Sequence, residues 1–294
     1  MKGRERMNDL AKATFQSGIE AIINSVEKTR GRSESDYVNA DGLLLCGVCG
    51  TRKQSRLKLP GIGERIVPIA CECAVREYND MQDKQRRYER EQARLRYIDL
   101  EKCRQYRFDQ DDQKNAEIAV TIQKYADNFG AALKRNIGLL LYGGVGTGKT
   151  FYAGCIANKL IDDDYSVVMT SVSQIVENTG EFARNKGKKE EYEEHLYKSD
   201  LLILDDLGAE RKTEYMEERI YAVVNKRYSS EKPLIVTTNL SKNDIQNPES
   251  VERKRTYDRI TEMCKAIEIP GGSRRVEKSN KLQKTFQEII EAKS

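Results

Sequence analysis

The segment Gly143–Thr150 restricts the fold more than any other feature of this sequence. It contains Gly-Gly-Val-Gly-Thr-Gly-Lys-Thr and follows the apolar run Gly138–Tyr142. Glycines allow the backbone to wrap closely around an anion and to direct its amide groups at phosphate oxygens. The order of apolar strand, glycine-rich loop and helix is typical of a P-loop, and it predicts an α/β fold.

The polar residues of this loop have distinct roles in the P-loop interpretation. Lys149 would contact the β and γ phosphates of ATP, and the Thr150 hydroxyl would bind magnesium. An incidental glycine-rich turn is the alternative, and the apolar strand before the loop argues against it. The predicted nucleotide contacts are Gly143, Gly144, Val145, Gly146, Thr147, Gly148, Lys149 and Thr150.

Short apolar runs alternate with stretches of helical pattern from Asn136 onward. Runs of this kind separated by helices predict βα units and a mostly parallel sheet that helices cover on both faces. Loops that carry chemistry are then expected at the carboxyl ends of the strands. The predicted strands are Gly138–Tyr142, Ser166–Thr170, Leu201–Leu204, Leu234–Thr237 and Ala266–Ile269.

Two adjacent carboxylates, Asp205 and Asp206, follow the buried-strand pattern of residues 201–204. Asp205 would orient magnesium, and Asp206 would position or polarise an attacking water molecule. Acids after a strand are also common loop residues, but the P-loop upstream favours the catalytic interpretation. Asn239, at the end of another predicted strand, is suited to bind the γ-phosphate or the water, because an amide both donates and accepts.

The order of these motifs resembles the AAA+ ATPases of the DnaC/DnaI helicase-loader and IstB family. The resemblance covers about residues 106–275. It implies a three-layer P-loop AAA+ ATPase with a five-stranded parallel sheet, and catalytic roles for Lys149, Asp205, Asp206 and Asn239. The matching motifs are the P-loop, Leu-Asp-Asp-Leu-Gly at 204–208, Arg227-Tyr228, Pro233 and Thr-Thr-Asn-Leu-Ser at 237–241.

The resemblance also implies arginines that sense the nucleotide. Arg259 matches the family's arginine finger, which acts on the ATP of a neighbouring copy, and Arg255 one helical turn earlier is the alternative. Residues 247–251 replace the family's usual Gly-Glu before this segment, so the finger can differ by one turn. A solvated helix face in the basic run 253–255 is the competing interpretation. Arg275 matches the second sensor, with Arg274 beside it.

Four of the seven cysteines form two close pairs, Cys46-x-x-Cys49 and Cys71-x-Cys73. Four thiolates close a tetrahedral zinc site, which is structural because no coordination position stays open. Unpaired buried thiols are the alternative, since the Cys-x-Cys half is less usual. The other three cysteines, which are expected to be packing residues, are Cys103, Cys155 and Cys264.

Composition and the resemblance together divide the chain into five segments. Residues 1–40 contain an amphipathic helix pattern from about Met7 to Arg30, which is a candidate for docking a helicase. His195, the single histidine, is expected on a solvated helix face within the ATPase segment. The remaining segments are 41–75, a zinc-binding knuckle; 76–106, a charged helical connector; 107–275, the ATPase domain; and 276–294, a basic tail.

Charged residues make up 33% of the sequence, yet the net charge is only +4, so any contact with nucleic acid must be local. Two basic stretches are candidates, and a solvated surface is the alternative for each. No apolar run is long enough to span a bilayer, so we expect a cytoplasmic protein without membrane contact. The basic stretches contain Arg52, Lys53, Arg56 and Lys58, and Arg274, Arg275, Lys278, Lys281 and Lys284.

Together with the resemblance, these features favour an ATP-dependent helicase loader in DNA replication. The expected partners are a replicative hexameric helicase, single-stranded DNA and further copies of the chain, which associate through the ATPase domain. ATP binding and slow, partner-stimulated hydrolysis would act as the assembly switch. Two alternatives stay open: an IstB-like transposition ATPase, and an ATP-sensing DNA-binding regulator with little hydrolysis, since Asp206 stands where many AAA+ proteins have Glu.

Overall fold

The computed structural model describes residues 33–59, 63–181, 185–209 and 213–291. The chain forms two compact units, residues 1–87 and residues 88–294, called unit 1 and unit 2 below. The predicted N-terminal helix of residues 7–30 lies outside the described residues. The boundary between the units falls inside the long helix α2 (Glu72–Tyr97).

Unit 1 contains two small antiparallel sheets and the first part of α2. Its buried hydrophobic side chains, among the residues described, are Leu43, Cys46 and Cys71. An apolar core of this size supplies little stability to the described part of the unit. The strands are β1 (Tyr37–Val38), β2 (Leu44–Leu45), β3 (Gln54–Leu59) and β4 (Gly63–Pro68).

A five-stranded parallel sheet forms the centre of unit 2, as predicted. The strand order is β6-β7-β8-β5-β9, so the strand before the P-loop, β5, lies between β8 and β9. Because all five strands are parallel, their carboxyl ends meet at one edge of the sheet. The strands are β5 (Gly138–Tyr142), β6 (Val167–Ser171), β7 (Leu201–Leu207), β8 (Leu234–Thr238) and β9 (Cys264–Glu268).

The predicted strands are all present, with shifts at some ends. β5 begins and ends as predicted, whereas β7 continues through the two carboxylates to Leu207. β9 begins at Cys264 instead of Ala266, because Cys264 and Lys265 extend the parallel pairing with β5. Lys265 is exposed, so the apolar pattern of the sequence did not include this part of the strand.

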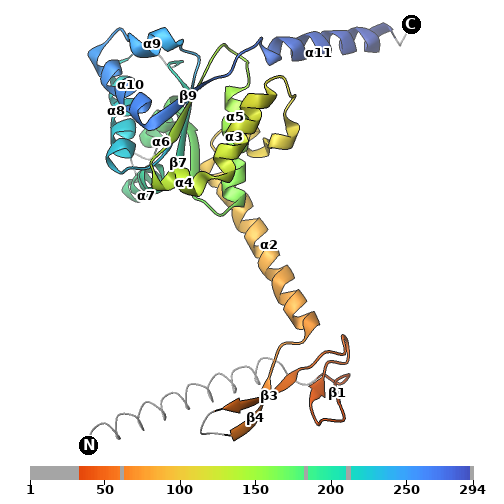
Figure 1. Ribbon diagram of the computed structural model, residues 1–294. Coiled ribbons are helices and arrows are strands. Elements are labelled where there is room, and N and C mark those ends of the chain that lie inside the picture. The colour runs from red at the N-terminus through yellow and green to blue at the C-terminus, as the bar shows by residue number, and fades with distance from the viewer. Residues whose placement is uncertain (1–32, 60–62, 182–184, 210–212, 292–294) are drawn as a thin grey trace, which may run out of the picture. The chain divides into compact units, whose positions relative to one another are not determined.

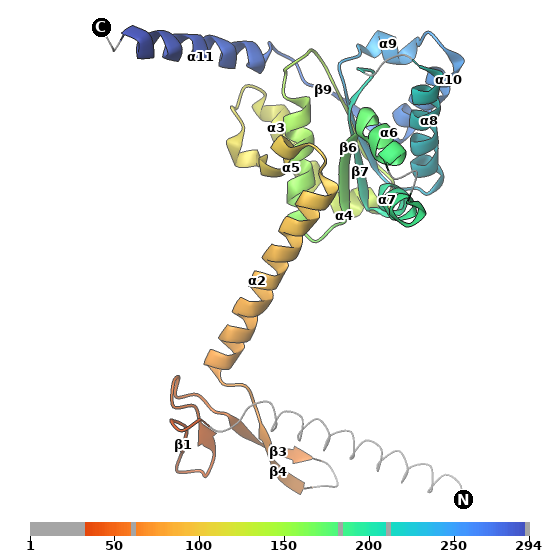
Figure 2. The same cartoon turned by 180° about the vertical axis from the view of Figure 1, so that it is seen from behind.

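Helices cover both faces of the sheet, which gives the three layers visible in Figures 1 and 2. Successive strand residues point to opposite faces, so Leu139 and Leu141 belong to one core cluster and Leu140 to the other. The first face carries α3 (Ala116–Asp127), α4 (Phe129–Lys134) and α5 (Lys149–Asp162). The second carries α6 (Val172–Glu181), α7 (Lys186–Lys198), α8 (Glu214–Ser229), α9 (Lys242–Gln246) and α10 (Val251–Met263).

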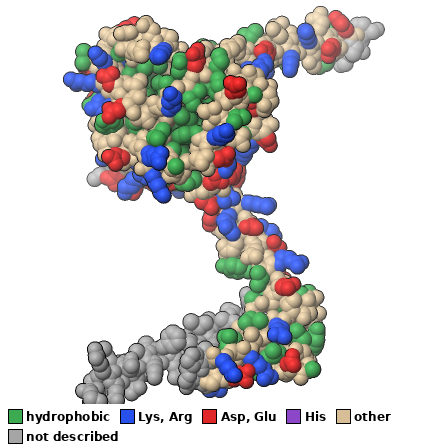
Figure 3. All heavy atoms as spheres, in the orientation of Figure 1, with side chains coloured by type: hydrophobic (Ala, Val, Ile, Leu, Met, Phe, Trp, Pro, Cys, Tyr) green, Lys and Arg blue, Asp and Glu red, His purple; other side chains and the backbone are tan. Residues whose placement is uncertain are grey.

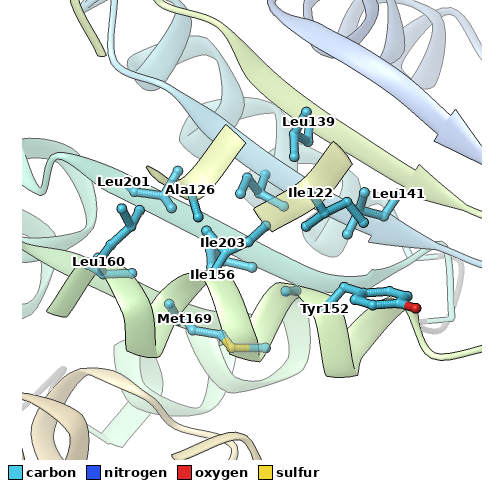
Figure 4. Close-up of a cluster of buried hydrophobic side chains, with 14 of the residues drawn as sticks. Ile122, Ala126, Leu139, Leu141, Tyr152, Ile156, Leu160, Met169, Leu201 and Ile203 are labelled. Atoms are coloured by element: carbon cyan, nitrogen blue, oxygen red, sulfur yellow. The ribbon is translucent and has the colours of Figure 1, made fainter. Parts of the chain in front are cut away.

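The core on the first face, drawn in Figure 4, fixes the helix that follows the P-loop. Ile156 and Leu160 of α5 share this cluster with Ile122 of α3 and with Leu141 and Ile203 of the sheet. All five side chains are fully buried. Burial of an aliphatic side chain contributes roughly 1.5–3 kcal/mol, so α5 is held firmly against the sheet.

The segment 76–106, predicted as a charged helical connector, differs from that prediction at its carboxyl end. Helix α2 ends at Tyr97, and two short 3-10 helices follow, η1 (Glu101–Gln105) and η2 (Phe108–Gln110). Ile98 is fully buried, and the buried Arg94 donates from Nε to Asn158 Oδ1 at 3.0 Å. This end of the stretch therefore belongs to the packed part of unit 2.

The described part of the predicted basic tail, residues 276–291, lies in the helix α11 (Arg274–Glu291), on which Leu282 and Phe286 are exposed. On the face of unit 2 in Figure 3, acidic and basic side chains are interspersed, in keeping with the small net charge. None of the helices in the described ranges combines the length and the apolar character that crossing a bilayer requires.

Candidate functional site

The segments predicted to bind nucleotide meet at the carboxyl ends of β5, β7 and β8. The P-loop follows β5 and leads into α5, whose N-terminal amides have no partner within the helix and are suited to bind an anion. A pocket of about 1040 Å³ lies at this edge. Among the residues that line it are Lys149, Thr150, Asp205, Asp206 and Asn239.

The P-loop backbone requires glycine at two positions in particular. Gly146 has a φ of 80° and Gly148 a φ of 109°, a region that residues with a side chain rarely adopt. A Cβ at Gly146 would lie 2.3 Å from Ser273 Oγ, and one at Gly148 would lie 2.6 Å from Arg274 Nη1. The segment that opens α11 therefore packs directly on the loop and leaves no room for a side chain.

Three oxygen acceptors hold the Lys149 ammonium inside the loop. Nζ donates to the carbonyl oxygens of Gly143 (2.9 Å) and Gly144 (2.7 Å) and to Asn239 Oδ1 (2.7 Å). Burial lowers the pKa of Lys149, and Asp206 and Asp205 oppose this shift. Within the described ranges no carboxylate forms an ion pair with Lys149, so its positive charge is available to phosphate oxygens.

Two hydroxyl groups from different elements fix Asp205. Thr150 Oγ1 donates to Oδ2 at 3.1 Å, and Thr237 Oγ1 donates to Oδ1 at 2.7 Å. Asp205 is only 6% exposed, and burial raises its pKa although these hydrogen bonds oppose the shift. The Thr150 hydroxyl and the Asp205 carboxylate thus lie together as hard oxygen donors, a set that suits magnesium.

Asp206 is exposed and has a left-handed backbone conformation, with a φ of 58°. Its amide donates to Thr237 Oγ1 at 2.8 Å, and Asn239 Nδ2 donates to Asp206 Oδ1 at 2.6 Å. The pairing of β7 with β8 shifts register between Leu204 and Leu207 at this point. Such a conformation costs on the order of 1–3 kcal/mol, and here the irregular ladder and the two hydrogen bonds maintain it.

Residues outside the recognised motifs complete the wall of the pocket. The rings of Tyr106 and Phe151, 5.2 Å apart, both line it. Arg274 donates to both carboxylate oxygens of Asp112, at 2.7 and 2.9 Å, and so lowers the pKa of Asp112 to about 2. Arg275 also lines the pocket. No local sequence pattern marks Asp112, because its partner is 162 positions away.

The two candidate finger arginines lie on α10 and do not line the pocket of their own chain. Arg259 is half-buried, with its guanidinium 4.9 Å from the ring centre of Tyr221 and 5.7 Å from that of Tyr228. Its Nη1 donates to the carbonyl oxygen of Arg255 at 3.1 Å. Arg255 itself is exposed.

The four paired cysteines of unit 1 converge, with all four Sγ atoms within 4.8 Å of one another. Sulfur ligands around a tetrahedral zinc ion lie about 3.8 Å apart, given Zn–S bonds of about 2.3 Å. A hydrogen bond from Thr51 lowers the pKa of Cys49 to about 6, whereas contact with Cys71 and the other thiols raises that of Cys73 to about 12. One ion at the centre of the cluster would contact all four sulfur atoms, so the donor set Cys46, Cys49, Cys71 and Cys73 fits zinc.

The predicted basic loop beside the cysteines is only partly free. Lys53 Nζ donates to the buried carboxylate of Asp36 at 2.5 Å, and Asp36 also accepts from the amide of Gly47. Lys53 therefore stabilises the cysteine knuckle and is not available to nucleic acid, contrary to the prediction. Arg56 is exposed but donates to the carbonyl oxygen of Asp41.

His195 also differs from the prediction of a solvated helix face. Its ring stacks on Tyr97 with centroids 4.6 Å apart, and its Nε2 lies 2.7 Å from the Tyr97 hydroxyl. It therefore joins the end of α2 to α7 and lies outside the nucleotide pocket. The prediction of packing roles is confirmed for the three buried cysteines, Cys103, Cys155 and Cys264.

Two solved structures resemble the described fold at low sequence identity. A crystal structure of the DnaC helicase loader gives a TM-score of 0.47 at 23% identity, covering 56% of this chain and 97% of that chain. The replication initiator DnaA bound to AMPPCP and single-stranded DNA gives a TM-score of 0.47 at 22% identity, covering 57% of this chain and 50% of that chain.

Sequence comparisons give closer matches. The family model of IstB-like ATP-binding proteins matches residues 74–282. The replicative helicase loader DnaI of Bacillus subtilis (strain 168) is 31% identical over 151 residues, which are 47% of this chain and 47% of that protein. The replicative helicase loader DnaC of Escherichia coli (strain K12) is 31% identical over 136 residues, 46% of this chain and 53% of that protein. The chain thus spans about half the length of these relatives.

Proposed function

This chain belongs to the family of IstB-like ATP-binding proteins, and on that premise we propose that it is an ATP-dependent loader of a replicative helicase. Similar proteins named replicative helicase loaders support the proposal. The observation that carries its dependence on ATP is the hydrogen-bonded chain in which Asn239 bridges Lys149 and Asp206 at the P-loop. These contacts place the positive charge of Lys149 and the negative charge of Asp206 beside the expected phosphate position, as phosphoryl transfer to water requires.

The residues of the pocket divide the work of ATP hydrolysis. Lys149 and the amides of the loop would bind the phosphates, while Thr150 and Asp205 would hold magnesium. Magnesium supplies the positive charge that offsets charge developing on the phosphate oxygens. Asp206, oriented by Asn239, positions the attacking water and accepts its proton.

Hydrolysis is completed between copies of the chain in this proposal. Arg259 is the finger that approaches the ATP of an adjacent copy, and Arg255 is the alternative on the same helix. Arg275, in the pocket of its own chain, is the second sensor. Turnover of ATP therefore depends on self-association through the ATPase domain.

The partners follow from the segments outside the ATPase domain. Residues 1–40 dock the replicative hexameric helicase, and the assembled ATPase domains bind single-stranded DNA. A zinc ion held by the four paired cysteines stabilises residues 41–75. Binding and hydrolysis of ATP act as the switch for assembly, with slow turnover that the oligomer, the helicase or DNA stimulates.

Co-purification with candidate hexameric helicases, with and without ATP, tests the loader function. The full chain is expected to retain a helicase, and a chain without residues 1–30 is expected to lose it while ATP hydrolysis continues. If the shortened chain also retains the helicase, the docking site lies outside residues 1–30. Failure of the full chain to retain any replicative helicase would rule out the loader function.

Substitution of the candidate finger tests the trans arrangement. Arg259→Ala is expected to keep ATP binding and to lose oligomer-stimulated hydrolysis by a factor on the order of a thousand. Arg255→Ala, measured in parallel, decides which of the two arginines acts. Unaltered turnover in both variants would exclude α10 as the source of the finger.

A second candidate function is that of an ATP-sensing DNA-binding regulator with little hydrolysis. It is favoured by the short side chain of Asp206, which is engaged by Asn239 and reaches less far than the Glu that many AAA+ proteins use. ATP binding without turnover in the presence of helicase and DNA would support this alternative over the loader.

A further inference from the structure

The guanidinium of Arg259 is held without being neutralised. It lies over the rings of Tyr221 and Tyr228, at 4.9 and 5.7 Å from their centres. Its Nε is buried without a hydrogen-bond partner, and no ion pair of Arg259 with a carboxylate occurs in the described part of the chain. A cation over aromatic faces is attracted by their quadrupoles and keeps its full charge.

The two tyrosines form a clamp on a rigid support. They are seven positions apart on α8, two helical turns, and so share one face of that helix. Helix α10 is fixed to α8 by Glu217, which accepts from Ser250 Oγ at 3.3 Å and from Arg253 Nε at 2.7 Å. Because Glu217 joins α8 to α10, the clamp on α8 and Arg259 on α10 are held in fixed positions relative to each other.

Tyr228 also engages an acid of α10 that is spaced to pair with Arg259. Glu262 is three positions after Arg259, the spacing at which a carboxylate can pair with an arginine on a helix. Instead, the Tyr228 hydroxyl donates to Glu262 Oε1 at 2.8 Å, and this bond raises the pKa of Tyr228. The ring of Tyr228 thus contacts the Arg259 guanidinium, while the Tyr228 hydroxyl binds Glu262, the carboxylate that could otherwise pair with Arg259.

We propose that Tyr221 and Tyr228 are positioning residues that keep the Arg259 guanidinium ordered and free of an acid partner, so that it can bind an anion outside its own chain. The anion of matching chemistry is the terminal phosphate of ATP on an adjacent copy. That identification rests on the trans arrangement under the proposed function.

Mixing two inactive variants tests the clamp. Arg259→Ala chains keep the nucleotide pocket, and Lys149→Ala chains keep the clamp but cannot bind ATP. Their mixture is expected to regain hydrolysis, because the second chain supplies Arg259 to ATP on the first. Adding Tyr221→Leu to the Lys149→Ala chain should lower kcat of the mixture about threefold to tenfold, as loss of one cation–π contact allows. KM for ATP should not change, and Tyr221→Phe, which keeps the ring, should have no effect.

A second pair of donor variants tests the role of the phenol. Tyr228→Phe in the Lys149→Ala chain keeps the ring but frees Glu262 to pair with Arg259, so kcat of the mixture is expected to fall. Tyr228→Phe combined with Glu262→Gln removes the competing charge and is expected to restore kcat. A purely structural role of Tyr228 predicts no such rescue. Circular dichroism of each donor checks that it is folded.

The outcomes separate the clamp from the trans arrangement. If Arg259→Ala alone hydrolyses ATP normally, the trans role fails and the clamp fails with it. Suppose that the mixture of Arg259→Ala and Lys149→Ala chains is active. If Lys149→Ala chains that also carry Tyr221→Leu or Tyr228→Phe restore hydrolysis equally well, the trans role stands and the clamp is overturned. If Glu262→Gln does not restore the kcat that Tyr228→Phe lowers, the proposal that Tyr228 keeps Glu262 away from Arg259 is also overturned.

Discussion

At the residue scale, Thr237 sets the relation between the two carboxylates of the pocket. Its hydroxyl donates to Asp205 Oδ1 and accepts from the amide of Asp206. Thr237 is 1% exposed, so neither bond is exchanged readily with water. One side chain from β8 therefore fixes both the acid assigned to magnesium and the acid assigned to water.

Thr237→Val keeps the shape of the side chain and removes both bonds. We expect ATP hydrolysis to fall about tenfold or more with ATP binding retained, and the free energy of unfolding to fall by about 1–3 kcal/mol. Turnover, nucleotide binding and denaturant unfolding measure the three quantities. Thr238→Val is the matched control, because Thr238 Oγ1 donates to the Leu207 carbonyl and contacts neither acid. Equal losses of turnover in both variants would contradict the role of Thr237.

At the element scale, Arg227 joins the end of α8 to the loops that precede β7 and β8. It is fully buried, and its guanidinium donates to the carbonyl oxygens of Ser199 at 2.7 Å and Pro233 at 2.6 Å. Burial lowers its pKa to about 10, so the side chain stays charged near neutral pH. The residue braces α8 against the two strands that lead to the acids and to Asn239.

Arg227→Leu removes the guanidinium donors from those carbonyl oxygens. We expect the free energy of unfolding to fall by about 3 kcal/mol, because several hydrogen bonds to one charged group are lost together. Thermal unfolding followed by circular dichroism measures the change. Lys226→Leu on the exposed side of the same turn is the control and should change stability by less than about 0.5 kcal/mol. A melting temperature for Arg227→Leu equal to that of the control would refute the brace.

At the scale of the whole molecule, the two units draw their stability from different sources. Unit 2 has two large apolar clusters on the faces of its sheet, whereas the described part of unit 1 buries few hydrophobic side chains around four converging cysteines. Metal binding can supply the folding free energy that a small core lacks. We therefore expect the stability of unit 1, and not that of unit 2, to depend on zinc.

Removal of metal with a strong chelator tests this division. Residues 33–75 are expected to become sensitive to protease, while ATP binding by unit 2 persists. Zinc content, the positions of cleavage and nucleotide affinity are the measurements, and Cys46→Ser should reproduce the effect without chelator. Protein purified without chelator that contains no zinc would remove the metal site from the proposal.

Much of the architecture was predictable because its signals are local. The strand preceding Gly143–Thr150, the acids at the end of β7 and the close cysteine pairs depend on residues near one another in the sequence. Strand periodicity and the spacing of a loop are properties of short segments. The five strands could therefore be predicted from the sequence, and so could many of the residues that line the pocket.

By itself, then, the sequence determined the P-loop fold and the chemistry of its candidate residues, since both follow from short patterns. Only the tertiary structure decided which long-range partners they meet: Thr237 for Asp205, Asp36 for Lys53, and the α8 tyrosines for Arg259. The physical reason is that these contacts depend on strand order and helix packing. The order β6-β7-β8-β5-β9 places β8 between β7 and β5 although it follows both in the chain, and spacing along the chain does not encode that neighbourhood.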